Sequence, residues 1–311
     1  MPKPLFRGVC ASTITPFNPS GGLNLDLLPA HIDWMIDEGA DAISPLGSSG
    51  EFPSLEIDDR KRLLDAALAA NNGRVPVVAG THHCSTRHTV ELSKHAEQAG
   101  ADALLIVPPY YMAPTPSQVM VHYRAVAEAV SIPIVLYHSI TMTAVDLKTN
   151  HLVQLFEEGV IGGVKMSNSE PDRICELLQA TDGRLFVYAG IDTVAFEGLS
   201  HGAHGWISGI PSMIPGVARR LYEAIAERGD LPAARQIWSQ LAPLMRLQFG
   251  LYHSKGDGAH WFSVMKAALN MIGPPVGDPC PPVLPLEPQY HALLADSLRT
   301  LGYEVREEVL L

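Results

Sequence analysis

One lysine of this 311-residue chain stands where a charged side chain is costly. Lys165 lies inside the apolar run VIGGVKM. A buried ammonium is unfavourable unless it is paired or loses its proton, and a neutral amine in a dry pocket is the nucleophile that condenses with a ketone. A lysine that reaches solvent from a strand end, or one paired with a neighbouring carboxylate, would explain the position equally well. Position alone therefore leaves catalysis and structure open.

The other six lysines predict no chemistry. We expect one at the terminus (Lys3), one in a loop (Lys255), and four on polar faces or at ends of helices: Lys61, Lys94, Lys148 and Lys266. An amphipathic helix turns such side chains toward solvent. The contrast singles out Lys165.

Two further segments carry groups that could act with a lysine. GSSGE (47–51) supplies the hydroxyls of Ser48 and Ser49 and backbone N–H groups in a glycine-flanked turn, which suits a carboxylate. Taken alone, this segment is better interpreted as an ordinary turn between a strand and a helix. Tyr137 ends an apolar run, and its phenol could relay protons, although a lone tyrosine is more often a core or rim residue. Tyr110 and Tyr111 follow two prolines and could also lie in an interface.

The sequence gives little support for a metal site or for a nucleophilic serine or cysteine. The histidine pairs 201/204 and 82/83 have no carboxylate at a metal-ligand spacing, so structural histidines are the better interpretation and we expect no metal. No GxSxG nucleophile motif is present. The four cysteines are scattered without a CxxC pair, which predicts reduced thiols rather than zinc ligands or disulfides: Cys10, Cys84, Cys175 and Cys280.

Composition limits the partners. The net charge of -11 argues against nucleic acid, because a phosphate-binding surface needs a basic stripe. No segment reaches the roughly 18 apolar residues of a membrane span. The start, MPKPLFRGVCAST, lacks the apolar stretch of a signal peptide. We therefore expect a soluble cytoplasmic protein with no membrane partner.

The elements that must position these residues form a regular series. Eight short apolar runs predict strands at 8–13, 42–47, 75–80, 102–108, 132–138, 161–166, 185–190 and 204–209. Helical patterns between them include 25–39, 57–70, 85–100, 117–130, 147–159 and 171–180. Strands that are continuously apolar indicate a parallel sheet covered on both faces. An open doubly wound sheet is the alternative, but 8–22 lacks the expected GxGxxG turn. The prediction is an α/β fold, a (β/α)8 TIM barrel over 1–222.

The strand pattern ends near residue 212. Four helical segments follow, at 218–230, 231–250, 260–273 and 288–302, with a proline-rich connector at 274–288. No flexible interdomain linker is evident. We expect 223–311 to form a C-terminal helical extension packed on the barrel.

In such a barrel, function gathers at the carboxyl ends of the strands, where these motifs fall. Their order and spacing resemble the dihydrodipicolinate synthase/N-acetylneuraminate lyase family over nearly the whole chain. GSSGE is similar to the family's GTTGE or GSTGE motif, and PPYY (108–111) to its PxYY segment. Tyr137 and Lys165 are 28 positions apart, as in the family. GVKMS matches the lysine-bearing strand, and GWISGIPSMIPG (205–216) the last strand and its loop.

The resemblance implies a mechanism and an assembly. Lys165 would form an iminium with C2 of a 2-oxo acid, Tyr137 would shuttle protons, and Tyr111 would enter from a neighbouring subunit. It also implies substrate-binding roles for Gly47, Ser48, Ser49, Met142, Asp192 and Ile207. The family is typically a homotetramer, a dimer of dimers, and needs no metal or organic cofactor.

Three positions depart from the family pattern. The run Tyr137-His138-Ser139-Ile140 replaces YNxP. Met142 stands where the synthases have an arginine for the second substrate's carboxylate, and an uncharged thioether cannot make that bidentate pair. Thr193 follows Asp192 where sialic-acid lyases have a glutamate. We expect the distal pocket to be formed by loops at 81–84, 139–143, 167–169 and 192–193.

Three hypotheses follow. The leading one is a Schiff-base-forming class I lyase, an aldolase or dehydratase acting on pyruvate or a 2-keto-3-deoxy sugar acid. The second is dihydrodipicolinate synthase itself, which condenses pyruvate with aspartate semialdehyde and would need another residue in place of the arginine. The third is a non-catalytic barrel that binds a 2-oxo acid as a sensor or partner protein.

Overall fold

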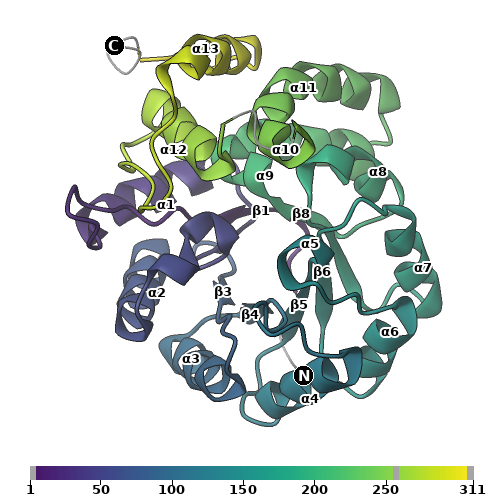
Figure 1. Ribbon diagram of the computed structural model, residues 1–311. Helices are drawn as coiled ribbons and strands as arrows, with labels where there is room; N and C mark the ends of the chain where they lie inside the picture. The colour runs from purple at the N-terminus through teal and green to yellow at the C-terminus, as the bar shows by residue number, and fades with distance from the viewer. Residues whose placement is uncertain (1–4, 255–258, 307–311) are drawn as a thin grey trace.

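The chain folds into a barrel of eight parallel strands ringed by helices (Figure 1). The computed structural model describes residues 5–254 and 259–306. The strands are β1 (Gly8–Ser12), β2 (Ala42–Ser44), β3 (Val78–Gly80), β4 (Ala103–Ile106), β5 (Ile134–His138), β6 (Gly163–Met166), β7 (Phe186–Ala189) and β8 (Gly205–Ser208). They pair in the order β2-β1-β8-β7-β6-β5-β4-β3, and a bridge between Ile43 and Val77 closes the ring. The predicted (β/α)8 TIM barrel is confirmed.

The continuous apolar character of the strands follows from burial on both faces. In β4, Leu104 and Ile106 belong to the large core between the sheet and the helices. Their neighbours Ala103 and Leu105 belong to a second cluster that fills the barrel interior. Both faces of a parallel sheet are thus removed from water, so every position is apolar rather than every second one. A polar side chain inside such a strand, such as Lys165, needs its own explanation.

The helices lie where their patterns predict, and local sequence marks their ends. The helices of the barrel are α1 (Leu28–Asp37), α2 (Ile57–Asn71), α3 (Thr86–Ala99), α4 (Pro116–Ala127), α5 (Ile140–Thr143), α6 (Thr149–Glu157), α7 (Asp172–Ala180), α8 (Ala195–Ser200), α9 (Gly209–Met213) and α10 (Pro215–Tyr222). Thr115 and Gln118 form a capping box at the start of α4, and α3 ends at Gly100 in the left-handed conformation. The short helices α5, α8 and α9 have no counterpart among the predicted elements.

The C-terminal helices pack on one side of the barrel. Helix α10 continues into a π-helical turn (Glu223–Glu227), followed by α11 (Leu231–Ser254), α12 (Trp261–Ile272) and α13 (His291–Thr300). These three helices contact one another, and α12 also contacts α9 at the end of β8 (Figure 1). The expected C-terminal helical extension is therefore present. None of the helices in the described ranges combines the length and the apolarity needed to cross a bilayer.

One lysine prediction is wrong. Lys266 does not lie on a polar face: its side chain is 2% exposed within α12, and its Nζ lies 2.8 Å from Oε1 of Glu51. A lysine tolerates such burial when acceptors surround it, and the helical pattern carries no sign of an acceptor that is distant in sequence. Lys94 and Lys148 are exposed and Lys61 is half-buried. Lys3 and Lys255 lie outside the described residues.

Candidate active site

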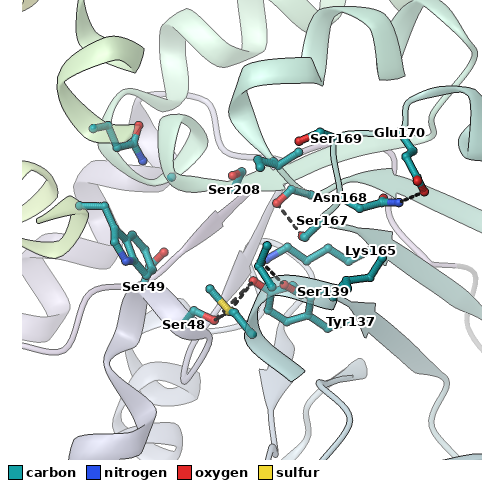
Figure 2. Close-up of a pocket in the computed structure, with 18 residues that line it drawn as sticks. Ser48, Ser49, Tyr137, Ser139, Lys165, Ser167, Asn168, Ser169, Glu170 and Ser208 are labelled. Carbon is teal, nitrogen blue, oxygen red and sulfur yellow. Dashed lines mark hydrogen bonds between the residues drawn. The ribbon is translucent and has the colours of Figure 1, made fainter. Parts of the chain in front are cut away.

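A cavity of about 430 Å³ opens at the carboxyl ends of the strands (Figure 2). Strand ends, loops and C-terminal helices all contribute to its wall. It is lined by Ser48, Ser49, Tyr137, Ser139, Ile140, Thr141, Met142, Lys165, Ser167, Asn168, Ser169, Glu170, Gly190, Ile191, Ser208, Gly209, Gln248 and Trp261. Among these lining residues, Lys165 is the only lysine or arginine.

Lys165 and Tyr137 meet because their strands are in register. Tyr137 of β5 pairs with Lys165 of β6, and both side chains turn into the barrel. The lysine is 5% exposed, and its Nζ lies 3.7 Å from the centre of the Tyr137 ring. Gly190 makes room for it, since a Cβ there would lie 2.8 Å from Cγ of Lys165. The predicted pair is therefore assembled within the cavity.

The environment of Tyr137 favours its ionised form. Burial alone would raise the pKa of the phenol, but the nearby charge of Lys165 and hydrogen bonds with Ser48, Lys165 and Ser167 outweigh it, so the pKa of Tyr137 is lowered. The Ser48 hydroxyl donates to the phenol oxygen across 3.5 Å. A phenol with a lowered pKa, beside an amine, can give up and recover a proton at a reacting atom.

The serine turn forms the wall next to Tyr137. Ser48, Ser49 and Gly50 make a single 3-10 turn after β2, with Gly47 as its extended N-cap. The Thr15 hydroxyl donates to the Gly50 carbonyl across 2.6 Å, which fixes the turn against β1. Ser48 and Ser49 both line the cavity, whereas Gly47 does not. Hydroxyls and backbone N–H groups gathered at one turn are suited to a carboxylate.

Known proteins resemble this chain over nearly its whole length. Residues 5–301 match the model of the dihydrodipicolinate synthetase family. The chain belongs to this family. A 4-hydroxy-tetrahydrodipicolinate synthase of Ralstonia nicotianae is 34% identical over 295 residues, which are 95% of this chain and 97% of that protein. The expected class, a class I aldolase-type lyase of this family, is confirmed.

Solved structures of the family superpose closely on the chain. YagE of E. coli K12, a prophage protein solved in complex with pyruvate, matches with a TM-score of 0.88 and 29% identity, covering 96% of this chain and 99% of that one. A monomeric dihydrodipicolinate synthase variant matches with a TM-score of 0.85 and 28% identity, covering 96% and 97% of the two chains. The similarity thus extends over both the barrel and the C-terminal helices of the present chain.

The distal half of the cavity belongs to loops and short helices. Two of the four expected loops, 139–143 and 167–169, supply lining residues, whereas none comes from 81–84 or 192–193. Met142 projects from α5, with its Sδ 3.8 Å from the phenol oxygen of Tyr137 and 4.0 Å from Oγ of Ser48. Glu170 accepts a hydrogen bond from Asn168 at the far side (Figure 2). The thioether therefore lies beside the phenol of Tyr137 and the hydroxyl of Ser48.

Arg173 and His138 hold these distal loops from behind. The guanidinium of Arg173 lies 2.9 Å from Asp146, 3.2 Å from Glu170 and 2.6 Å from the carbonyl of Leu147. His138 accepts the Leu147 N–H at Nε2 across 3.1 Å. Burial, and then the charge of Arg173, lower the pKa of His138 to about 4, so the imidazole is neutral near pH 7. His138, which replaces the family asparagine, thus supports the segment after α5.

Two lining residues come from parts of the chain that sequence reasoning did not connect with the site. Gln248 lies in α11 and Trp261 begins α12. Both sit in helices whose apolar pattern predicts packing and nothing more. No motif suggested Glu170. Ser208 at the end of β8 and Gly209 at the start of α9 also line the cavity, and they lie at a strand end, where function is expected to gather.

Four predicted site residues do not line the cavity: Gly47, Tyr111, Ile207 and Asp192. Tyr111 is 87% exposed, and Ile207 is buried in the barrel interior. Asp192 is buried behind the wall, where it accepts the backbone N–H groups of Gly209 and Ile210 across 3.1 and 3.2 Å. Burial is the main cause that raises the pKa of Asp192 to about 6.

In residues 5–254 and 259–306, no group of three or more His, Cys, Asp or Glu side chains is placed to hold a metal ion. The four cysteines are free: Cys10, Cys84, Cys175 and Cys280.

Proposed function

We propose that Lys165 forms an iminium with C2 of a 2-oxo acid and that the protein is an aldolase or dehydratase of pyruvate or a 2-keto-3-deoxy sugar acid. The observation that carries the proposal is the buried pair of Lys165 and Tyr137, 3.7 Å from amine to ring centre, in the wall of a cavity of about 430 Å³. A covalent amine catalyst works best when it is shielded from water beside a proton carrier, and the 5% exposure of Lys165 next to Tyr137 supports the proposal.

The proposed steps use only this chain's groups. After its ammonium group gives up a proton, the amine of Lys165 attacks C2, and the carbonyl oxygen leaves as water. The resulting iminium accepts the electron pair when the C3–C4 bond breaks, or when a proton leaves C3 before loss of a hydroxide, protonated as water, from C4. Tyr137 carries protons to and from the reacting atoms, while Ser48 and Ser49 hold the carboxylate. Because the iminium is itself the electron sink, the reaction requires no cofactor.

The distal half favours a neutral group on the substrate. It presents the hydroxyls of Ser139 and Thr141 and the thioether of Met142, and Glu170 is the carboxylate among the lining residues. Among the described residues that line the cavity, a second substrate carboxylate would find no cation besides Lys165, and burying an unpaired charge is costly. Sugar-acid hydroxyls would instead find donors and acceptors, which supports a 2-keto-3-deoxy sugar acid.

The test is reductive trapping. Borohydride with pyruvate, and then with a panel of 2-keto-3-deoxy sugar acids, should add the mass of the reduced adduct to Lys165 and abolish activity. A folded protein whose Lys165 stays unmodified would contradict the proposal. Product analysis for each acid that is trapped then separates cleavage from dehydration.

Dihydrodipicolinate synthase itself is the second candidate, favoured by the 34% identity to the Ralstonia enzyme. Met142 weighs against it. A coupled assay with pyruvate and aspartate semialdehyde decides the question, and negligible turnover eliminates this candidate. The third candidate, a non-catalytic 2-oxo acid-binding protein, is disfavoured by the intact pair Tyr137 and Lys165. Trapping without turnover across the whole panel would revive it.

We also propose a homotetramer, a dimer of dimers, in which Tyr111 completes the proton relay of a neighbouring subunit. Its 87% exposure leaves the phenol available to a second copy. Because one matching solved structure is of a monomeric variant, the mass of the assembly in solution must be measured.

Free cysteines are consistent with the cytoplasmic location that we infer. We propose that the barrel comprises residues 1–222 and that residues 223–311 form the helical region packed on it.

A further inference from the structure

A buried ion pair joins the serine turn to the C-terminal helices. Glu51 follows the turn directly, and its Oε1 lies 2.8 Å from Nζ of Lys266 in α12. The two side chains are 1% and 2% exposed. They are 215 positions apart in the chain, so the contact exists only in the folded protein.

Backbone groups on both sides reinforce this pair. Lys266 donates to the carbonyl of Thr15 across 2.9 Å and to that of Asp278 across 2.7 Å. The N–H of Cys280 donates to Oε2 of Glu51 across 2.8 Å. Thr15 in turn donates its hydroxyl to Gly50. The serine turn, the β1 end and the 278–280 connector are therefore linked through one amine and one carboxylate.

The backbone at Glu51 needs such support. Glu51 has φ 52° and ψ 35°, the left-handed region that favours glycine, and it separates the serine turn from the next 3-10 turn (Phe52–Ser54). A side-chain-bearing residue keeps this conformation only where its surroundings fix it. The contacts of Glu51 with Lys266 and Cys280 supply that constraint, and they act on the residue next to the turn that carries Ser48 and Ser49.

Stability is a weak reason for such a pair. Two buried charges lose their hydration, and an apolar pair of similar volume is often at least as stable. What apolar side chains cannot supply is directional contact with two carbonyls and an N–H group at once. The arrangement therefore favours a role in geometry.

Resting on the function proposed above, we propose that Glu51 and Lys266 are positioning residues. They hold the serine turn in the conformation that receives the substrate carboxylate. Affinity for the 2-oxo acid thus depends on α12 and the 278–280 connector, 200 and more residues after the turn. Neither side chain lines the cavity, so neither needs to touch the substrate.

The test compares Lys266→Met with the double variant Glu51→Gln/Lys266→Met in the full-length protein. Two quantities are measured: the pyruvate concentration at half-maximal borohydride adduct, read by intact mass, and the midpoint of thermal unfolding. Lys266→Met should raise the half-saturating pyruvate about 10- to 100-fold, because small displacements of binding groups have effects of this order. Adduct should still form fully at saturating pyruvate, since Lys165 is untouched.

The double variant separates positioning from stability. It removes the lone buried charge, so its unfolding midpoint should recover toward that of the unmodified protein, while its half-saturating pyruvate stays raised. Recovery of both quantities together would overturn the inference. If Lys266→Met does not fold, the double variant is compared directly with the unmodified protein, and unchanged half-saturation again overturns it.

Lys61→Met is the matched control. Lys61 forms an ion pair with Glu91 across 2.6 Å, but that pair is partly exposed and joins α2 to α3. Neither measured quantity should change appreciably. A failure of the proposed function looks different, because the unmodified protein would then give no adduct at any pyruvate concentration.

Discussion

The two halves of the cavity are built in different ways. The proximal half places Lys165 and Tyr137 on adjacent strands in fixed register, and the distal half places Met142 on a four-residue helix and Glu170 in a loop. Lys165 is 5% exposed and Met142 is 37% exposed. Strand register leaves little freedom to the first pair, whereas loops tolerate change. The proximal half is therefore suited to a constant chemical step and the distal half to a variable substrate.

The largest effect should come from the proximal lysine. Lys165→Ala removes the only amine among the described residues that line the cavity, so the covalent step is lost and activity should fall by a factor on the order of 10⁴ or more. Reductive trapping with pyruvate should give no adduct. The unfolding midpoint serves as the control and should not fall, because a buried cation is replaced by a small apolar side chain. Substantial remaining activity would contradict the proposal that the proximal half carries out the chemical step.

Tyr137→Phe should reduce kcat about 10²- to 10³-fold, the usual contribution of a positioned acid or base. Burial acts to raise the pKa of Tyr137, but the Lys165 charge and the hydrogen bonds lower it overall. If the neutral phenol must donate, activity falls as pH rises through this lowered pKa, at a lower pH than for an ordinary tyrosine. A pH profile of kcat checks this, and the alkaline limb should disappear in Tyr137→Phe. An unchanged limb would assign the titration to another group.

A gain of function tests the distal half. Met142→Arg places a guanidinium next to Tyr137 and Ser48, where a second carboxylate could bind. A charge-assisted hydrogen bond of this kind should raise kcat/KM for aspartate semialdehyde with pyruvate about 10- to 100-fold. Turnover of a 2-keto-3-deoxy sugar acid, whose distal end is uncharged, should fall in the same variant. Met142→Leu, which keeps the apolar character, is the control and should leave the ratio of the two activities close to its original value.

The same contrast explains what could be predicted from the sequence. Lys165 stood out because a cation interrupts an apolar strand, but its predicted role came from the spacing to Tyr137 and from the family resemblance. Its distance from Tyr137 is a property of two neighbouring strands. The barrel itself followed from eight continuous apolar runs. Trp261 and Gln248 could not be assigned, because their places in the wall depend on how α11 and α12 pack on the barrel. The misplacement of Lys266 has the same origin, since Glu51 becomes its neighbour only after folding.

The smallest expected effect lies behind the distal wall. Arg173→Lys keeps the charge, but an ammonium cannot contact Asp146, Glu170 and the Leu147 carbonyl in the geometry of the guanidinium. Both distal loops should loosen, raising the KM for a long 2-oxo acid about three- to tenfold. Half-saturation of adduct formation by pyruvate should not change, because the proximal half does not contact Arg173.

Arg184→Lys provides the matched control for that variant. Arg184 pairs with Glu157 across 2.6 Å on an exposed surface, so the same substitution there should alter neither constant. If Arg173→Lys raised the half-saturating pyruvate as much as the KM for the longer acid, the two halves would be mechanically coupled. A loss confined to the longer acid means that the distal wall can be reshaped without disturbing the lysine, which is the condition under which one barrel can serve many substrates.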